Sequence, residues 1–234
     1  MRRIALFLFL TTILAAQSVK EVELTAEPHH QLVFENAQVR VFNVDVAPHT
    51  DTLMHWHHHD YMYVMLGASE VVNAVKGKDP VPGKLQDGQA GFAPGNFAHI
   101  VHNGSQPFRN ITIELRQDDK LHKSSPHWDP AHPEDDRGLD VLHGGTKEIL
   151  FVKDGIRVSQ LEFQPGGVEP LHHHAGPYLI VALTDYELRS DVEGKPPATV
   201  TMKRGEIKWV PGAFSHTLTN TGKTQAKLVT LEFH

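Results

Sequence analysis

Two stretches of this sequence decide its fold: PHTDTLMHWHHHDYMYVMLG at residues 48–67 and PGGVEPLHHHAGPYLIVALT at residues 165–184. They align without a gap when the chain is shifted by 117 residues. The same shift superposes the sequence from Phe34 to Asn103 on its second copy, with about twenty identical positions. Chance would give only a few identities because no residue type dominates the composition. The chain therefore contains a duplicated domain.

Both copies have the pattern of short β-strands. Residues 38–46 and 156–163 alternate apolar and polar side chains, whereas residues 61–66 and 178–183 are short apolar runs. The apolar runs suit strands that are buried on both faces. Turn signals built from glycine and proline recur at close spacing, which indicates about eight short strands per copy. The predicted fold class is all-β, with two tandem jelly-roll β-barrels.

The composition narrows the classes of function. The chain has 234 residues, no cysteine and a formal net charge of −6. No run of lysine or arginine forms a basic patch, so nucleic acid is not an expected partner. Without cysteine the fold depends on no disulfide. The unusual count is that of histidine, with 18 residues.

The N-terminal segment predicts export. Arg2 and Arg3 precede an apolar run at residues 4–16, and Ala15, Ala16 and Ser18 supply small residues for cleavage. We expect a signal peptide at 1–18 and a secreted or periplasmic protein with no membrane span after cleavage. The run is short for a bilayer span, although an uncleaved membrane anchor is the alternative.

The remaining chain divides into three parts. The expected boundaries are an N-terminal barrel at 19–116, a linker at 117–138 and a C-terminal barrel at 139–234. The linker is rich in proline, aspartate, histidine and lysine and lacks periodicity. Its histidines are expected to be solvated, with a role as a lid over a barrel as the alternative.

Three histidines in each copy have the spacing of a metal site. Two of them are separated by one residue, which on a strand points both rings to one face. A third follows about forty residues later, after a turn. Imidazole nitrogens that converge in this way bind borderline divalent metals at about 2.0–2.2 Å. The predicted ligands are His55, His57 and His99 in the first copy and His172, His174 and His216 in the second.

These motifs resemble those of the cupin superfamily. In the second copy Gly166 precedes the first histidine by the spacing of the first cupin motif. The second cupin motif recurs in both copies as glycine, proline, histidine and asparagine. The resemblance covers nearly the whole mature chain and implies a two-domain cupin similar to the quercetinase-like members. It also implies a small-molecule substrate or ligand.

One departure from the cupin motif bears on the chemistry. The glutamate that supplies a fourth ligand in cupins resembling oxalate decarboxylases and germins is absent. Tyr61 and Tyr178 hold its place, or Asp60 does if the first copy is one residue shorter there. Both tyrosines fall on the ligand face and are candidate catalytic residues that could donate a proton, with core packing as the alternative.

Three functional hypotheses follow from this site. The first is a metal-dependent dioxygenase, because three neutral imidazoles leave coordination positions for an organic ligand and O₂. The second is an isomerase or lyase that uses the metal as a Lewis acid. The third is a non-catalytic protein that binds a small ligand or the metal itself. Iron is the first choice of divalent metal, with Mn, Ni, Zn or Cu as alternatives, and a homodimer is one expected assembly.

Further expectations concern the surroundings of the two sites. Glu114 and Glu232 end strands and are expected to be structural, and Trp56 and Trp209 to pack. The barrels are expected to have separate cores, with the first barrel carrying the reactive site. Metal binding is expected to weaken below pH ~6.5, where free imidazoles take up protons.

Overall fold

The computed structural model describes residues 20–116 and 142–233, and it confirms the all-β fold. Within these ranges the only helical segment is a 3-10 turn, Leu24–Ala26. The expected signal peptide and the expected linker, with its histidines, lie outside the described residues. In the part of the chain that is described, no helix is long and apolar enough to cross a membrane.

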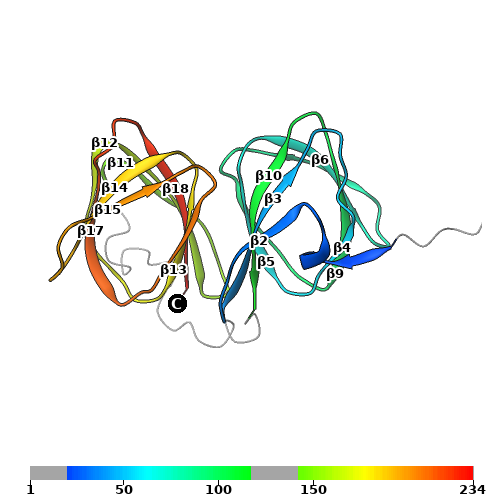
Figure 1. Cartoon of the computed structure of the whole chain (residues 1–234), viewed down its shortest axis with the longest axis horizontal. Helices are drawn as coiled ribbons and strands as arrows, with labels where there is room; N and C mark the ends of the chain where they lie inside the picture. The colour runs from blue at the N-terminus through cyan, green and yellow to red at the C-terminus, as the bar shows by residue number, and fades with distance from the viewer. Residues whose placement is uncertain (1–19, 117–141, 234) are drawn as a thin grey trace, which may run out of the picture.

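The first barrel is built from ten strands in two five-stranded sheets, ordered β1-β4-β9-β6-β7 and β2-β3-β10-β5-β8. The strands are β1 (Glu21–Glu23), β2 (His30–Glu35), β3 (Val39–Val46), β4 (Met54–His57), β5 (Tyr61–Met65), β6 (Ser69–Val75), β7 (Val81–Leu85), β8 (Ala90–Ala93), β9 (Phe97–Asn103) and β10 (Phe108–Leu115). In Figure 1 they enclose the barrel on the right.

The second barrel repeats this plan with one longer strand. Its strands are β11 (His143–Lys153), β12 (Ile156–His174), β13 (Tyr178–Ala182), β14 (Tyr186–Val192), β15 (Ala198–Met202), β16 (Ile207–Val210), β17 (Phe214–Asn220) and β18 (Ala226–Phe233). The first part of β12 pairs with β18 and its last part pairs with β17. In the first barrel two separate strands make these pairings: β3 pairs with β10, and β4 pairs with β9. Its strands therefore form two sheets.

The backbone confirms the alignment of the two copies at a turn where their residues differ. His49 stands where the second copy has Gly166, and both have a positive φ, 55° and 78°. This left-handed conformation is natural for glycine and uncommon for other residues. The two turns therefore have the same backbone shape although their residues differ.

The main hydrophobic core lies between the two barrels rather than inside either one. On β3, Val39 and Val41 face the second barrel, while Phe42 and Val44 pack inside the first. On β18, Leu231 faces the first barrel in the same way. Each of these strands is buried on both faces, which explains their continuous apolar composition.

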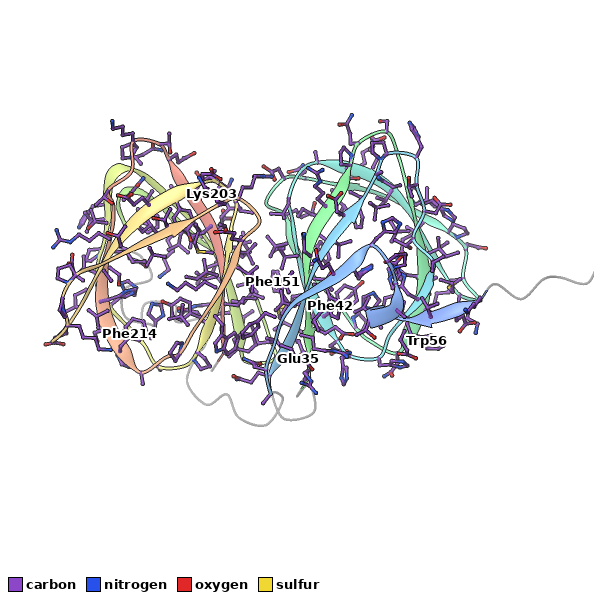
Figure 2. The ribbon with its side chains drawn as sticks, in the orientation of Figure 1. Glu35, Phe42, Trp56, Phe151, Lys203 and Phe214 are labelled. Carbon is purple, nitrogen blue, oxygen red and sulfur yellow. The ribbon has the colours of Figure 1, made fainter. Side chains whose placement is uncertain are left out.

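This shared core corrects the expectation of separate cores. One cluster of fully buried side chains draws on β3, β5 and β10 from the first barrel and on β12, β13 and β18 from the second. Phe151 packs against it, and Figure 2 shows this side chain between the barrels. At the edge, Trp209 stacks on Phe34 with ring centroids 5.8 Å apart. The two barrels therefore bury one apolar surface together.

Candidate metal centres

The second barrel brings its three predicted ligands together at one point. His172 and His216 are directly opposite each other on the paired strands β12 and β17, and His174 lies two residues further along β12. The Nε2 atom of His174 is 3.1 Å from that of His172 and 3.1 Å from that of His216. All three side chains are buried.

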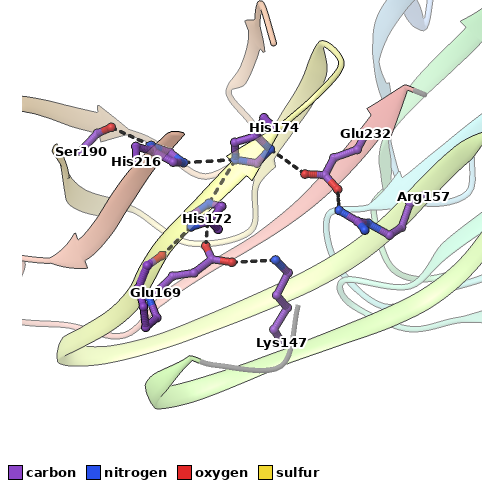
Figure 3. Close-up of polar contacts among 9 residues, drawn as sticks. Lys147, Arg157, Glu169, His172, His174, Ser190, His216 and Glu232 are labelled. Carbon is purple, nitrogen blue, oxygen red and sulfur yellow. Dashed lines mark hydrogen bonds and ion pairs between the residues drawn. The ribbon is translucent and has the colours of Figure 1, made fainter. Parts of the chain in front are cut away.

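Hydrogen bonds on the other ring nitrogen set the direction of each of these imidazoles (Figure 3). Nδ1 of His172 donates to the carbonyl of Pro170 at 2.7 Å, and Nδ1 of His174 donates to Glu232 at 2.8 Å. Nδ1 of His216 lies 2.8 Å from the hydroxyl of Ser190. A proton on Nδ1 leaves the lone pair of His172 and His174 on Nε2, and the Nε2 atoms of all three rings face the same point.

The first barrel repeats the arrangement with different partners. His55 and His99 are opposite each other on β4 and β9, and their Nε2 atoms are 3.0 Å apart. Nδ1 of His55 donates to the carbonyl of Leu53, and Nδ1 of His99 contacts the side-chain oxygen of Asn73 at 2.7 Å. His57 completes the set, with its ring centroid 5.1 Å from those of both other histidines.

The spacing of these nitrogens fits a bound metal ion. A metal about 2.1 Å from two nitrogens at a right angle places the nitrogens about 3.0 Å apart. The observed Nε2 separations are 3.0–3.1 Å. Unprotonated nitrogens that close would repel each other unless a cation lies between them. The donor chemistry and the geometry therefore both fit a divalent metal.

Burial keeps these histidines neutral. Desolvation lowers the pKa of His55 to about 4, and that of His99 and His216 to about 3. Desolvation also lowers the pKa of His57 and of His174. A neutral imidazole is the form that binds a metal, so the folded protein is ready for binding well below neutral pH.

Tyr61 and Tyr178 occupy the same place in their barrels. Tyr61 stacks on His57 and Tyr178 on His174, each with ring centroids 4.2 Å apart. Burial raises the pKa of both phenols, which keeps them protonated at neutral pH. Asp60 does not replace the missing motif glutamate, because its side chain accepts a hydrogen bond from the backbone of Gly95 at 2.7 Å.

The two strand-ending glutamates have a role near the site that the sequence did not suggest. Glu232 bridges the Nδ1 of His174 and the guanidinium of Arg157. In the first barrel Arg40 binds Glu114, but Oε1 of Glu114 and Nδ1 of His57 are buried without a hydrogen-bond partner. Their purely structural assignment is therefore too narrow, at least for Glu232. The available signal was that Glu114 and Glu232 match each other in the internal repeat after one inserted residue.

Four further residues near the sites also escaped sequence analysis. In the first barrel the buried His30 lies beside His55, and Glu27 holds it through a contact of 2.6 Å. In the second barrel Glu169 lies 3.6 Å from Nε2 of His172 and pairs with Lys147 at 2.6 Å. None of these four is a fixed residue of a cupin motif, although Glu169 lies between Gly166 and His172 of the first motif. The 117-residue shift places His30 on Lys147, so the repeat already showed that the two copies differ in residue type at this position.

A cavity adjoins each histidine cluster. The one in the first barrel has a volume of about 290 Å³ and is lined by polar as well as apolar groups, including Tyr63, Asn73 and Thr112. The one in the second barrel has a volume of about 230 Å³, and aliphatic and aromatic side chains form most of its wall, which also includes Lys147, Glu169 and Lys208. Both are large enough for a small organic molecule.

Comparison with known proteins identifies the fold. No protein-family model matches the sequence, and no curated protein matches it either. The structure is similar to that of oxalate decarboxylase from Bacillus subtilis, with a TM-score of 0.60, 14% identity, and coverage of 84% of this chain and 68% of that one. It is also similar to a cupin 2 conserved barrel domain protein from Leptotrichia buccalis, with a TM-score of 0.52, 14% identity and 88% of each chain covered.

The described chain is thus an all-β protein of two jelly-roll barrels, each with a buried histidine cluster. More particularly, it has the fold of the two-domain cupins, as the sequence motifs predicted. At 14% identity the likeness concerns the fold. The histidine clusters themselves support metal binding.

Proposed function

We propose that this protein is an exported, metal-dependent enzyme that acts on a small organic molecule. The observation that carries the proposal is a cluster of buried histidines beside a cavity in each barrel, with three Nε2 atoms converging in the second. A bound divalent metal would supply Lewis acidity and, if it is iron or copper, the ability to react with O₂. The residues of the chain would bind and orient the substrate.

The reaction we propose first is an O₂-dependent dioxygenation. Three neutral imidazoles are compatible with a metal that has free positions for a chelating substrate and O₂. The protonated phenols of Tyr61 and Tyr178 can donate a hydrogen bond or a proton to a ligand in the cavity. We assign the reaction to the first barrel because polar side chains line its cavity and can orient a substrate.

The first test joins metal analysis to oxygen consumption. Protein purified from its native compartment should contain two metal equivalents per chain, and iron or copper should be among them. A panel of small chelating phenols and diketones is then screened for O₂ uptake. Tyr61→Phe should lower the rate on any active compound, with retention of metal as the control. Full turnover in the absence of O₂ would contradict the dioxygenase assignment.

A lyase acting on a small carboxylic acid is the second candidate. The structural likeness to oxalate decarboxylase favours it. The buried Lys147 lines the cavity of the second barrel, where a cationic side chain could face an anionic substrate. Release of CO₂ from small carboxylates, followed with each metal in turn, separates this candidate from the first. Tight ligand binding without turnover of any compound would instead indicate a binding protein.

Export and assembly are proposed on the sequence pattern. The mature chain should begin near residue 19, and mass spectrometry of protein from the native host tests this directly. An intact Met1 on cytosolic protein would exclude export. We further propose a homodimer, which sedimentation of the metal-loaded protein would distinguish from a monomer.

A further inference from the structure

We propose that each barrel adds a fourth ligand that is not a fixed residue of the cupin motifs and that the two fourth ligands differ. His30 completes a four-nitrogen site in the first barrel, and Glu169 completes a site of three nitrogens and one oxygen in the second. The inference rests on metal binding by the histidine clusters. A fourth ligand leaves one fewer open position on an octahedral metal for the substrate and O₂ of the proposed reaction.

His30 is placed as a ligand would be. It is the first residue of β2, and its side chain is buried at 8% exposure. One of its ring nitrogens lies within 4.8 Å of a ligand nitrogen in both His55 and His57. Its ring centroid is 4.7 Å from that of His55. His30, His55 and His57 thus form one group of nitrogens, and His99 adjoins the group with its Nε2 3.0 Å from that of His55.

Glu27 fixes the orientation of His30. Its Oε2 lies 2.6 Å from Nδ1 of His30 and also accepts the backbone N–H of His29, while Oε1 accepts the backbone N–H of Leu53. The carboxylate is fully buried and cannot turn away. With Nδ1 held, Nε2 is the atom left to bind a metal. A carboxylate behind a metal-bound histidine is the usual partner that orients the ring.

The second barrel has exchanged both positions. Lys147 replaces His30, and Glu169 stands where the first copy has Thr52. Oε1 of Glu169 accepts from Lys147 at 2.6 Å, and Oε2 lies 3.6 Å from Nε2 of His172. Figure 3 shows this carboxylate between the ammonium group and the histidines. A charged lysine cannot ligate, but it holds Glu169 beside the cluster.

The exchange changes which metals the two sites prefer. Imidazole suits copper, nickel, zinc and iron, whereas a carboxylate oxygen makes a site more suitable for manganese. The first barrel should therefore favour copper or nickel over manganese more strongly than the second. One chain could then hold two different metals.

The experiment isolates the first site in the full mature chain by using His174→Ala as the background. The apoprotein is loaded with one equivalent of Cu(II), and the EPR spectrum is compared with that after His30→Ala. We expect the nitrogen hyperfine pattern to change from four nitrogens to three. We also expect the affinity, measured by competition with a chelator, to fall at least about tenfold.

Two variants make the result specific. His29→Ala removes the neighbouring histidine, whose Nδ1 contacts the carbonyl of Asp45, and should leave the spectrum unchanged. Glu27→Gln keeps His30 in place but weakens its orientation, so an intermediate loss of affinity is expected. This variant also keeps the test decisive if His30→Ala does not fold. An unchanged spectrum and affinity in Glu27→Gln and His30→Ala would overturn the assignment.

An increase in copper affinity after His30→Ala would also overturn it, because His30 would then be a charged partner of Glu27 that repels the metal. The second site is tested in a His57→Ala background, where Glu169→Gln should lower Mn(II) affinity more than Cu(II) affinity. Equal losses for both metals would refute the role of Glu169. If the unmodified protein binds no metal, the proposed function fails as well; if it binds two and His30→Ala changes nothing, only this inference fails.

Discussion

The two barrels share the same fold and the same three histidines, yet the groups that touch those histidines differ. Ser190 in the second barrel replaces Asn73 in the first as the partner of the third histidine. Lys147 and Glu169 stand beside the second cluster, whereas the pair of His30 and Glu27 stands beside the first. Duplication thus kept the positions that define the fold and the ligands and changed the positions one contact away. Those neighbours set the charge and the donor atoms of each site.

The strongest test of the comparison is removal of one ligand from each barrel. His57→Ala and His174→Ala should each reduce the metal content from two equivalents per chain to about one, because each removes one of the converging nitrogens. Metal content is measured by plasma mass spectrometry after dialysis. His58→Ala is a matched control, since this exposed histidine contacts Glu23 instead of the cluster. Full metal content in both ligand variants would exclude the assignment.

Acid should destabilise the metal-free protein by several kcal/mol. The unfolded chain protonates its histidines near pH 6.5, but burial lowers the pKa of folded His55 to about 4 and of His216 to about 3. Between pH 6.5 and about 4 the unfolded state therefore binds more protons, so stability falls as the pH falls. Each histidine contributes up to about 1.4 kcal/mol per pH unit. Urea unfolding of chelator-treated protein at pH 7.5, 6 and 5 measures the slope.

The same pKa shifts revise the sequence-based expectation for metal binding. Free imidazoles would lose a metal near pH 6.5, but the folded sites stay neutral and should hold it to a lower pH. Titration of the loaded protein with acid checks this, and His55→Ala should make the stability of the apoprotein less dependent on pH. A midpoint of metal release at pH 6.5 with no prior unfolding would contradict the shifts.

The shared core should couple the stability of the two barrels. Leu231→Ala removes a side chain that faces the first barrel, and Leu228→Ala removes one from the interior of the second on the same strand. Each should cost about 2–5 kcal/mol. Hydrogen exchange in β3 and β10 should rise in Leu231→Ala more than in Leu228→Ala. Equal exchange in both variants would mean that the barrels are independent.

The sequence alone was sufficient to predict the fold, because the repeat and the strand pattern are visible without any knowledge of how the strands pack. The spacing of His172 and His174 placed both rings on one face, and the structure agrees. The position of His30 beside His55 could not be predicted, because it depends on how β2 folds across the barrel and β2 contains no cupin motif. The shared core was missed for a related reason. Apolar runs show that a strand is buried on both faces but do not say what covers the second face.

The smallest expected effect concerns a turn whose residue type differs between the barrels while its backbone shape is the same. His49 has a φ of 55° and the matching Gly166 a φ of 78°. No atom lies within 4 Å of a Cβ built on Gly166, so Gly166→Ala tests backbone strain alone. It should destabilise the protein by about 1 kcal/mol.

His49→Gly relieves the strain but makes the unfolded chain more flexible, so the two effects partly cancel and a change within about 0.5 kcal/mol is expected. Thermal unfolding of both variants, with metal bound, measures the pair. A loss of stability in His49→Gly as large as that in Gly166→Ala would show that the His49 side chain makes a stabilising contact, and the turns would then differ in more than their residue type.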